Sequence, residues 1–276
     1  MTYRECYETG RSILKVAGVS EADLDARLLL EYICGTDRNE LLVHGERRVS
    51  EEQEYRYRDI IKKRAKRIPL QYLTGYQEFM GLDFLVNESV LIPRQDTEIL
   101  VEEVLKNLRD GFSILDMCTG SGCILLSLLR YSNDCTGVGV DLSGEALEVA
   151  AQNAERLGIE AQWLNSDLFD QVCGSFEIIV SNPPYIRTDV IAGLEPEVRD
   201  HEPLSALDGA SDGLSFYRRI TADSTAYLKG GGMLFFEIGY DQAEAVRQLM
   251  ERNGFLDVRV VKDYAGLDRV VFGTKP

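Results

Sequence analysis

The spacing of apolar residues along the chain changes near residue 70. Before that point, apolar positions recur every three to four residues, as in "ADLDARLLLEYI", which is typical of helices that bury one face. Ser20 and Ser50 are expected to cap two of these helices, and Pro69 is expected to end the last one. Residues 1–70 are therefore predicted to form a small N-terminal helical domain.

Beyond this domain the pattern becomes that of strands. The segment "EFMGLDFLVN" alternates apolar and polar residues, so residues 71–92 are predicted to be a β-hairpin linker. From residue 93 onward, helical stretches separate most of seven apolar strands, at 112–117, 136–142, 160–165, 176–181, 232–239, 256–263 and 268–274. Such alternation implies a mostly parallel sheet with helices on both faces. Residues 93–276 are predicted to be a Rossmann-like α/β domain that binds ligands beyond the carboxyl ends of its strands.

The loop after the first of these strands is rich in glycine. In "DMCTGSGC" (116–123), Gly120 and Gly122 allow the backbone to approach a ligand closely before the next helix begins. The dinucleotide fingerprint GxGxxG needs a third glycine, and Leu125 occupies its place, so an NAD site is only weakly supported. The loop alone fits both a nucleotide-type cofactor and a plain strand-to-helix turn.

Two carboxylates stand at the ends of the next two strands. Asp141 is placed to accept both hydroxyls of an adenosine ribose, and Asp167 is placed to accept from an exocyclic amine such as that of adenine. The alternatives are a helix N-cap for Asp141 and a solvated turn residue for Asp167. Carboxylates in successive strand-end loops, with no phosphate to hold, indicate S-adenosylmethionine as the cofactor. Thr119 and Leu168 are counted with the same cofactor-binding set.

The fourth strand runs into the sequence "NPPY", which spans Asn182 to Tyr185. Its two prolines cannot extend the strand and hold the loop stiff. The stretch resembles the [DNS]PP[YFW] motif of methyltransferases that act on nitrogens conjugated to a π-system, whose delocalised lone pair makes them poor nucleophiles. By this resemblance, the Asn182 side-chain oxygen and the Pro183 carbonyl each accept one N–H of the target NH₂. Pro184 completes the substrate pocket and the Tyr185 ring stacks on the target, while Asn182 also borders the cofactor.

The formal charge of −16 is unevenly spread. Residues 1–85 hold 14 basic and 15 acidic side chains, so the remaining 16 basic and 31 acidic ones leave the rest of the chain strongly acidic. Nucleic-acid binding depends on neutralising phosphates, so direct contact with nucleic acid is not expected, and a basic protein partner suits the chain better. The one basic run, "KKRAKR" (62–67), is interpreted as a solvated helix end, with a polyanion contact as the alternative.

Cysteine spacing and hydropathy bear on the cellular setting. The six cysteines show no CxxC spacing and have no histidines nearby, so neither a disulfide framework nor a metal site is predicted. The start, "MTYRECYETG", has no apolar signal-peptide core, and the longest apolar runs are too short to span a bilayer. A cytoplasmic protein with reduced thiols and no membrane contact is expected.

Five blocks together resemble the peptide chain release factor glutamine methyltransferases over nearly the full length: "IPLQYLTGYQEFMGLDFLVNESVLIPRQDTEILVE", "LDMCTGSGCI", "SNPPYI", "HEPLSALDGASDGLSFYR" and "KDYAGLDRVVFG". The resemblance implies a class I S-adenosylmethionine-dependent methyltransferase. Its reaction would be methyl transfer to the side-chain N5 of the glutamine in the Gly-Gly-Gln loop of bacterial class I release factors. It also implies that the helical domain contacts the release factor. A monomer is expected.

Four residues depart from the family pattern: Met80 and His201, where a Tyr is more common, and Gln95-Asp96, where Pro-Glu is more common. His201 is interpreted as structural rather than as a general base. The alternative functions are methylation of a ribosomal-protein glutamine, N6-adenine methylation of DNA or RNA, and non-catalytic binding through the helical domain. Net acidity speaks against the nucleic-acid alternative, and an intact "NPPY" speaks against the non-catalytic one.

Overall fold

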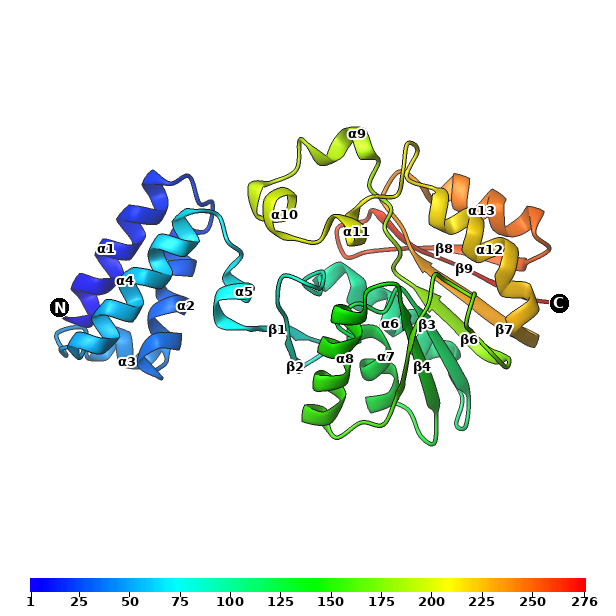
Figure 1. The fold of residues 1–276 in the computed structure, drawn as a ribbon, viewed down its shortest axis with the longest axis horizontal. Helices are drawn as coiled ribbons and strands as arrows, with labels where there is room; N and C mark the ends of the chain where they lie inside the picture. Colours follow the sequence, from blue (N-terminus) through cyan, green and yellow to red (C-terminus); the bar gives the residue numbers. More distant parts are fainter. The chain divides into compact units, whose positions relative to one another are not determined.

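The computed structural model describes residues 1–276, which form two compact units (Figure 1). The first unit contains Met1–Tyr76 and the separate segment Glu195–His201, and the second contains Gln77–Leu194 and Glu202–Pro276. The chain therefore passes between the units at three places, after residues 76, 194 and 201. In neither unit is there a helix with both the length and the apolar character needed to cross a bilayer.

The first unit is a helical bundle, as the period of its apolar residues predicts. It consists of α1 (Tyr3–Val16), α2 (Ala22–Cys34), α3 (Arg38–Val43), α4 (Glu51–Ala65), α5 (Leu70–Thr74) and, from the separate segment, α10 (Pro196–His201). Helices α1, α2 and α4 pack around a core that includes Leu29 and Ile61. Ser50 caps α4, which confirms that prediction. The prediction for Ser20 is wrong, because α2 begins after Glu21, which makes no side-chain cap bond.

The basic run at 62–67 is only partly the solvated helix end that the sequence predicts. Its lysines are exposed, but the Arg64 side chain is 7% exposed and lies 2.7 Å from a carboxylate oxygen of Asp25 and 2.8 Å from one of Glu197. Arg67 also binds Glu197. A guanidinium is buried only when carboxylates offset its desolvation. The interpretation is wrong for these two arginines, because Asp25 and Glu197 are distant from them in sequence.

The second unit is built on one seven-stranded sheet, which confirms the predicted fold class. Its strands are β3 (Ser113–Met117), β4 (Thr136–Asp141), β5 (Gln162–Asn165), β6 (Phe176–Ser181), β7 (Leu228–Glu237), β8 (Leu256–Lys262) and β9 (Asp268–Thr274). They stand in the order β5-β4-β3-β6-β7-β9-β8, with β9 antiparallel to β7 and to β8 and the other pairs parallel. The strand order reverses between β3 and β6, and α/β sheets bind ligands in the crevice at such a point.

Helices cover both faces of this sheet (Figure 1). One face carries α6 (Gln95–Asn107), α7 (Cys123–Arg130) and α8 (Gly144–Leu157), and the other carries α12 (Ser215–Tyr227) and α13 (Ala243–Arg252). Successive residues of β3 belong to different cores, since Ile114 lies in the same core as Leu100 and Leu115 in the same core as Tyr217. Burial on both faces explains why the strands read as nearly continuous apolar runs.

The predicted hairpin is present as a separate two-stranded sheet of β1 (Tyr76–Phe79) and β2 (Leu82–Leu85). Asn153 on α8 holds its second strand. The Asn153 side-chain oxygen accepts from the Leu85 N–H at 2.6 Å, and its amide nitrogen donates to the carbonyls of Leu85 and Ser121. One buried amide thus fastens β2 to the glycine-rich loop.

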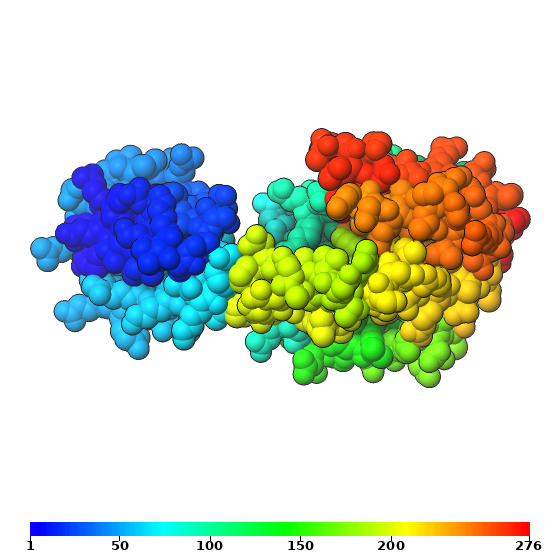
Figure 2. All heavy atoms as spheres, turned by 90° about the horizontal axis from the view of Figure 1, so that it is seen from above, coloured from blue at the N-terminus to red at the C-terminus, as the bar shows by residue number.

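The stretch between β6 and α12 carries three short helices: α9 (Thr188–Ile191), α10 and α11 (Leu204–Leu207). No residue of α9 or α10 is buried, and Figure 2 shows this yellow-green part of the chain at the surface. The two ends of the stretch are tied together, because the Gly209 N–H donates to the Ile186 carbonyl at 2.8 Å. This stretch therefore begins and ends beside "NPPY".

Candidate active site

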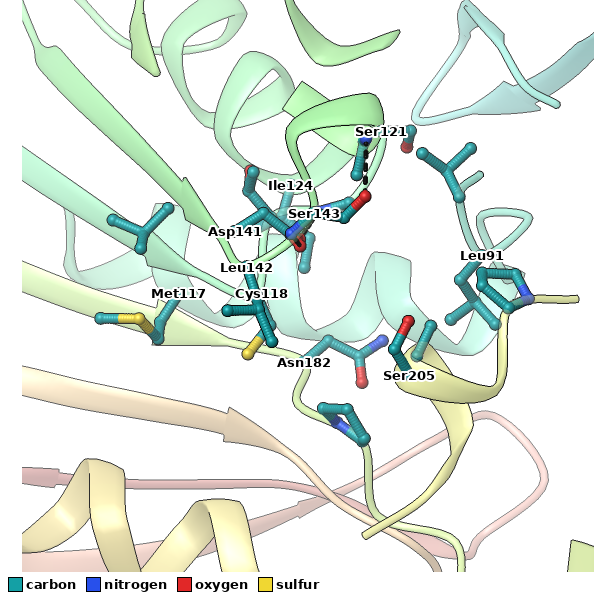
Figure 3. A pocket seen from close by; sticks show the side chains of 18 of the residues that line it. Leu91, Met117, Cys118, Ser121, Ile124, Asp141, Leu142, Ser143, Asn182 and Ser205 are labelled. Atoms are coloured by element: carbon teal, nitrogen blue, oxygen red, sulfur yellow. Dashed lines mark hydrogen bonds between the residues drawn. The ribbon is translucent and has the colours of Figure 1, made fainter. Parts of the chain in front are cut away.

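The carboxyl ends of β3, β4, β5 and β6 border a cavity of about 290 Å³ in the second unit. Its walls come from the loops after these strands, from the segment before α6, and from α11 and α12. Asp141 at the end of β4, Asn182 after β6, Leu91 before α6 and Ser205 on α11 approach it from separate parts of the chain (Figure 3). The predicted site residues that line it are Thr119, Gly120, Asp141, Asp167, Leu168, Asn182 and Pro184. Those that do not are Gly122, Pro183 and Tyr185.

The two glycines of the first loop differ in role. Gly120 lines the cavity with a left-handed backbone, at φ 54°, and its N–H donates to Asp141 Oδ2 at 2.9 Å. Gly122 precedes α7 at φ 78°, and a Cβ there would come 2.9 Å from the Trp163 ring. Gly120 therefore shapes the cavity wall, whereas Gly122 permits the close packing behind it.

The Thr119 side chain is held by a buried carboxylate that the sequence analysis did not predict. The Thr119 hydroxyl donates to Asp116 Oδ2 at 2.6 Å, so this hydroxyl is engaged inside the fold. Burial raises the pKa of Asp116 to about 7, although hydrogen bonds from Thr119 and the Leu125 backbone oppose the shift. A lone Asp inside the apolar strand "SILDM" is the signal that could have identified it.

Asp141 connects the first two loops. One carboxylate oxygen accepts from Gly120 N–H and the other from Ser143 N–H, both at 2.9 Å. The N-cap of α8 is Ser143, whose hydroxyl accepts from the Ala146 N–H, so the helix-cap interpretation of Asp141 is wrong. Burial raises the pKa of Asp141, and the backbone donors oppose that shift. Each carboxylate oxygen keeps a lone pair for a further donor in the cavity.

Asp167 and Leu168 follow β5. Asp167 is half-exposed and its Oδ1 lies 2.8 Å from the guanidinium of Arg219 on α12, so it is an ion-pair partner rather than a merely solvated residue. Leu168 is 5% exposed and has a left-handed backbone, at φ 51°. Such a backbone is uncommon outside glycine. Asp167 thus presents a carboxylate edge and Leu168 an apolar surface at the same rim of the cavity.

The "NPPY" loop begins where β6 ends beside β3. The Ser181 hydroxyl donates to the Met117 carbonyl at 2.7 Å and ties the two strand ends together. Asn182 then enters the cavity, and its side-chain nitrogen donates to the Thr97 hydroxyl at 3.3 Å. With its NH₂ group directed to Thr97, Asn182 keeps Oδ1 as a free acceptor. Pro183 and Pro184 are buried, which fixes this geometry.

Tyr185 points away from the cavity lining towards β7. Its hydroxyl donates to Glu237 Oε1 at 3.1 Å, and its backbone carbonyl accepts from the Gln242 side chain at 3.0 Å. Burial first, and the nearby carboxylate of Glu237 second, raise the pKa of Tyr185. The stacking role expected for this ring is not visible in the cavity walls, so it stays a prediction.

Several residues that the sequence did not single out surround this loop. Arg94 lines the cavity and pairs with Glu202, whose side chain is only 1% exposed. Arg269 on β9 lies 3.1 Å from Asp96 on α6 and 3.0 Å from Asp263. All of them fall in blocks of the quoted family pattern. Their pairing across the fold could not be obtained from that pattern.

The residues that depart from the family pattern do not line the cavity. The Met80 backbone, at φ 52°, donates to Glu98 and accepts from Tyr131, so it serves the hairpin turn. His201 is part of the first unit, and its Nε2 lies 3.3 Å from the Lys66 carbonyl. Neither Gln95 nor His201 lines the cavity. His201 is thus placed as a structural residue, as the sequence predicts.

The cavity fits an adenosine cofactor without phosphates. Its walls are largely apolar, with acceptor carboxylates at Asp141 and Asp167. The cations that line it, Arg94 and Arg219, are already paired with Glu202 and Asp167. No unpaired cation remains for a phosphate, whereas hydroxyl and amine donors find acceptors.

Comparison with known proteins gives matches to both parts of the chain. Residues 5–75 match the family described as PrmC N-terminal domain, and residues 94–192 match the methyltransferase small domain. A release factor glutamine methyltransferase of Geobacter sulfurreducens is 44% identical over 273 residues, which cover 99% of this chain and 96% of that protein. The one of Agrobacterium fabrum is 42% identical over 269 residues, covering 95% and 93%.

Solved structures share the fold of the second unit. A methyltransferase from Pyrococcus furiosus aligns with a TM-score of 0.54 at 19% identity, covering 71% of this chain and 89% of that one. A 16S rRNA N2 G1207 methyltransferase of T. thermophilus, solved in complex with AdoMet and guanosine, aligns with a TM-score of 0.52 at 21% identity, covering 73% and 50%. At such identities the likeness concerns the fold alone.

Proposed function

The chain belongs to the release factor glutamine methyltransferases, and we propose that it transfers a methyl group from S-adenosylmethionine to a release factor. The acceptor is the side-chain N5 of the glutamine in the Gly-Gly-Gln loop of class I peptide chain release factors. The main observation in support of this proposal is the orientation of the Asn182 side chain. It stands at the switch point of the sheet with its NH₂ group on Thr97 and its Oδ1 free to accept.

Asn182 and Pro183 activate the glutamine by geometry. The Asn182 Oδ1 and the Pro183 carbonyl each accept one N–H of the substrate NH₂ and direct its nitrogen into the cavity. As the nitrogen gains positive charge, both acceptors bind its hydrogens more strongly, which lowers the barrier. After transfer the nitrogen is acidic, and water takes its proton. Pro184 lines the pocket, and Tyr185, which is held by Glu237, keeps the loop rigid.

The residues around Asp141 hold the cofactor. Asp141 accepts the ribose hydroxyls, Asp167 accepts the adenine amine, and Leu168 packs on the base. The backbone of Thr119 and Gly120 lies along the amino-acid part, with Gly122 shaping this loop from behind. When bound, S-adenosylmethionine supplies an electrophilic methyl group on a sulfonium. The residues of this chain orient the amide of the substrate and exclude water from it.

The helical unit recognises the release factor. A groove in it is lined by Leu24, Leu41 and Leu42 next to Arg4 and Arg38. Leu42 is 69% exposed, and the neighbouring Val43 of α3 is 74% exposed. Exposed apolar residues rimmed by charge are typical of protein-binding surfaces. The enzyme acts as a cytoplasmic monomer that docks a protein and touches no nucleic acid directly.

The test is methyl transfer from labelled S-adenosylmethionine, offered in parallel to a class I release factor, ribosomes and DNA. Label should appear in the release factor, and peptide mapping should place it on the Gly-Gly-Gln glutamine. A release factor with that glutamine replaced by alanine is the matched control and should stay unlabelled. Label in ribosomal protein or in DNA, with none in the release factor, would overturn the proposal.

A second measurement addresses recognition alone. Leu42→Ser with Val43→Ser should weaken binding of the release factor at least about tenfold, since two exposed apolar side chains leave the interface. The affinity for S-adenosylmethionine, measured by calorimetry, should not change. Unaltered binding of the release factor would show that α3 does not contact the partner.

A further inference from the structure

Glu237 is a buried carboxylate at the end of a strand in the sheet, and the packing of the sheet does not require a charged residue there. It ends β7, and the register pairs Phe236 with Ser181, so Glu237 lies alongside Asn182 at the carboxyl edge of the sheet. The residue is 1% exposed. Placing a carboxylate inside a protein is costly, so a specific set of partners is expected to account for it.

Its partners belong to the substrate side of the site. The Tyr185 hydroxyl donates to Glu237 Oε1 at 3.1 Å. Burial raises the pKa of Glu237, while the Thr97 hydroxyl, acting as a hydrogen-bond partner, the charge of Arg269 and the Tyr185 hydroxyl oppose the rise. The other oxygen, Oε2, is buried without a hydrogen-bond partner, and we assign it as the acceptor for the Thr97 hydroxyl.

The direction of the hydrogen bonds then follows from chemistry. In its ionised form Glu237 only accepts, so a Thr97 hydroxyl bonded to it points its hydrogen at the carboxylate. The oxygen of that hydroxyl is left to accept, and it does so from the Asn182 nitrogen at 3.3 Å. Asn182 must therefore turn its NH₂ group inward and its Oδ1 towards the cavity. The opposite orientation would present a donor to the NH₂ group of the substrate.

We propose that Glu237 is a positioning residue for methyl transfer, which fixes Tyr185 directly and sets the amide orientation of Asn182 through Thr97. The inference rests on the proposed function, because Oδ1 matters only if the substrate is an amine or amide donor. Glu237 touches neither substrate nor cofactor. Its effect is to make one of two amide orientations of Asn182 strongly preferred.

The main test is Glu237→Gln, which keeps the shape of the side chain but can donate as well as accept. Thr97 is then free to turn its hydrogen towards Asn182, and the amide orientation is no longer enforced. We expect kcat for release factor methylation to fall at least about tenfold. The KM for release factor and the Kd for S-adenosylmethionine should stay within about twofold. A wild-type kcat in the folded variant would overturn the proposal.

Thr97 supplies the second arm and decides the matter if Glu237→Gln does not fold. Thr97→Val removes the connecting hydroxyl with little change of shape, and Thr97→Ser keeps it. Valine should slow kcat about as much as Glu237→Gln, serine should rescue most of the rate, and the double variant should be no slower than the slower single one. If the two substitutions lower kcat independently in the double variant, or if Thr97→Ser and Thr97→Val have equal rates, Glu237 does not act through Thr97.

Two controls separate this proposal from simpler outcomes. Glu177→Gln changes a carboxylate at the opposite end of the sheet, where Glu177 binds Ser113 and Lys229, and kcat should not change. An activity-free readout is hydrogen exchange of the Asn182 side-chain amide by NMR, which should be slow in the wild type and fast in Glu237→Gln. If the exchange difference is found but the wild-type protein does not methylate release factor, the proposed function is refuted and the positioning role of Glu237 stands. Equal exchange in both proteins would refute the role of Glu237.

Discussion

The proposed cofactor side and the proposed substrate side of the cavity are built by different means. On the cofactor side, Asp141 accepts from the backbone N–H groups of Gly120 and Ser143, both in loops that directly follow strands. On the substrate side, Asn182 and Tyr185 are held by side chains of Thr97 and Glu237, which are 85 and 52 residues away in the chain.

The two sides should therefore respond differently to substitutions of their residues. Backbone donors are supplied whatever the neighbouring side chains are, so the cofactor side depends on a few residue types at fixed loop positions. The substrate side needs each of several polar side chains to find its partner after folding, and a network of this kind loses function when one member is removed. We therefore expect larger kinetic effects on the substrate side and larger binding effects on the cofactor side.

Asn182→Ala tests the substrate side most strongly. Removing one preorganised acceptor of the developing charge should lower kcat by at least about 10²-fold, with little change in the affinity for S-adenosylmethionine. Single-turnover methylation of release factor and calorimetry of the cofactor give the two quantities. A normal single-turnover rate would remove Asn182 from the mechanism.

Asn182→Asp refines the same test. Aspartate keeps an acceptor oxygen but cannot donate to the Thr97 hydroxyl, and it adds a charge beside Glu237 at the same edge of the sheet. We expect a loss nearly as large as for alanine, because like charges near a buried carboxylate are unfavourable. A rate near that of the wild type would mean that acceptance alone matters and that the bond to Thr97 is dispensable.

Asp141→Ala should have the largest effect on the cofactor side. Charge-assisted hydrogen bonds to ribose hydroxyls contribute roughly 1.5 to 3 kcal/mol each, so S-adenosylmethionine should bind at least about tenfold more weakly. Asp141→Asn, which keeps one acceptor oxygen, should fall between wild type and alanine in calorimetry. An unaltered Kd in folded Asp141→Ala would leave Asp141 with the structural role of joining Gly120 and Ser143.

Gly122→Ala tests the packing behind the cofactor loop. A side chain there must adopt a left-handed backbone at φ 78° and meets the Trp163 ring at 2.9 Å. The free energy of unfolding should fall by about 1 to 2 kcal/mol. Gly144→Ala, whose Cβ meets nothing within 4 Å and whose backbone is not left-handed, is the matched control and should leave stability nearly unaltered. Equal denaturation midpoints for the two variants would contradict the packing role.

Glu177, at the amino end of the sheet, should show the smallest effect. Burial raises its pKa, but hydrogen bonds from Lys229 and Ser113 outweigh burial and lower the pKa from 4.5 to about 2. A lowered pKa contributes stability above about pH 4.5, which is lost as the pH falls towards 2. Because Lys229 is half-exposed, the contribution should be about 1 kcal/mol or less.

The measurement for Glu177 is denaturant unfolding of wild type and Glu177→Gln from pH 7 to pH 3. The difference in unfolding free energy between the two proteins should shrink as the pH drops through this range. Methylation rates at pH 7 should be the same. A difference that stays constant with pH would mean that the Glu177 carboxylate is not stabilised by its ionic partners.

Sequence pattern alone determined the architecture and the cofactor side. Period-3.6 spacing predicted the helical unit, period-2 spacing predicted the hairpin, and short apolar runs predicted the seven strands, because burial of apolar residues leaves a local pattern in the chain. It also placed Gly120, Asp141, Asp167 and Asn182, since all of them follow directly from a strand whose end is recognisable. Gly122 was predicted to face a ligand but packs behind the loop, because its distance to Trp163 depends on how β4 pairs with both β3 and β5.

Tertiary structure alone decided the polar pairings. Thr97 and Glu237 read as ordinary positions in a helix and a strand, and only the register of β6 with β7 and the packing of α6 bring them to Asn182 and Tyr185. For the same reason, the Arg64 of a basic run became a buried partner of Glu197. A side-chain hydrogen bond acts over about 3 Å and carries no signature along the chain, so which groups meet is fixed only when the whole chain has folded.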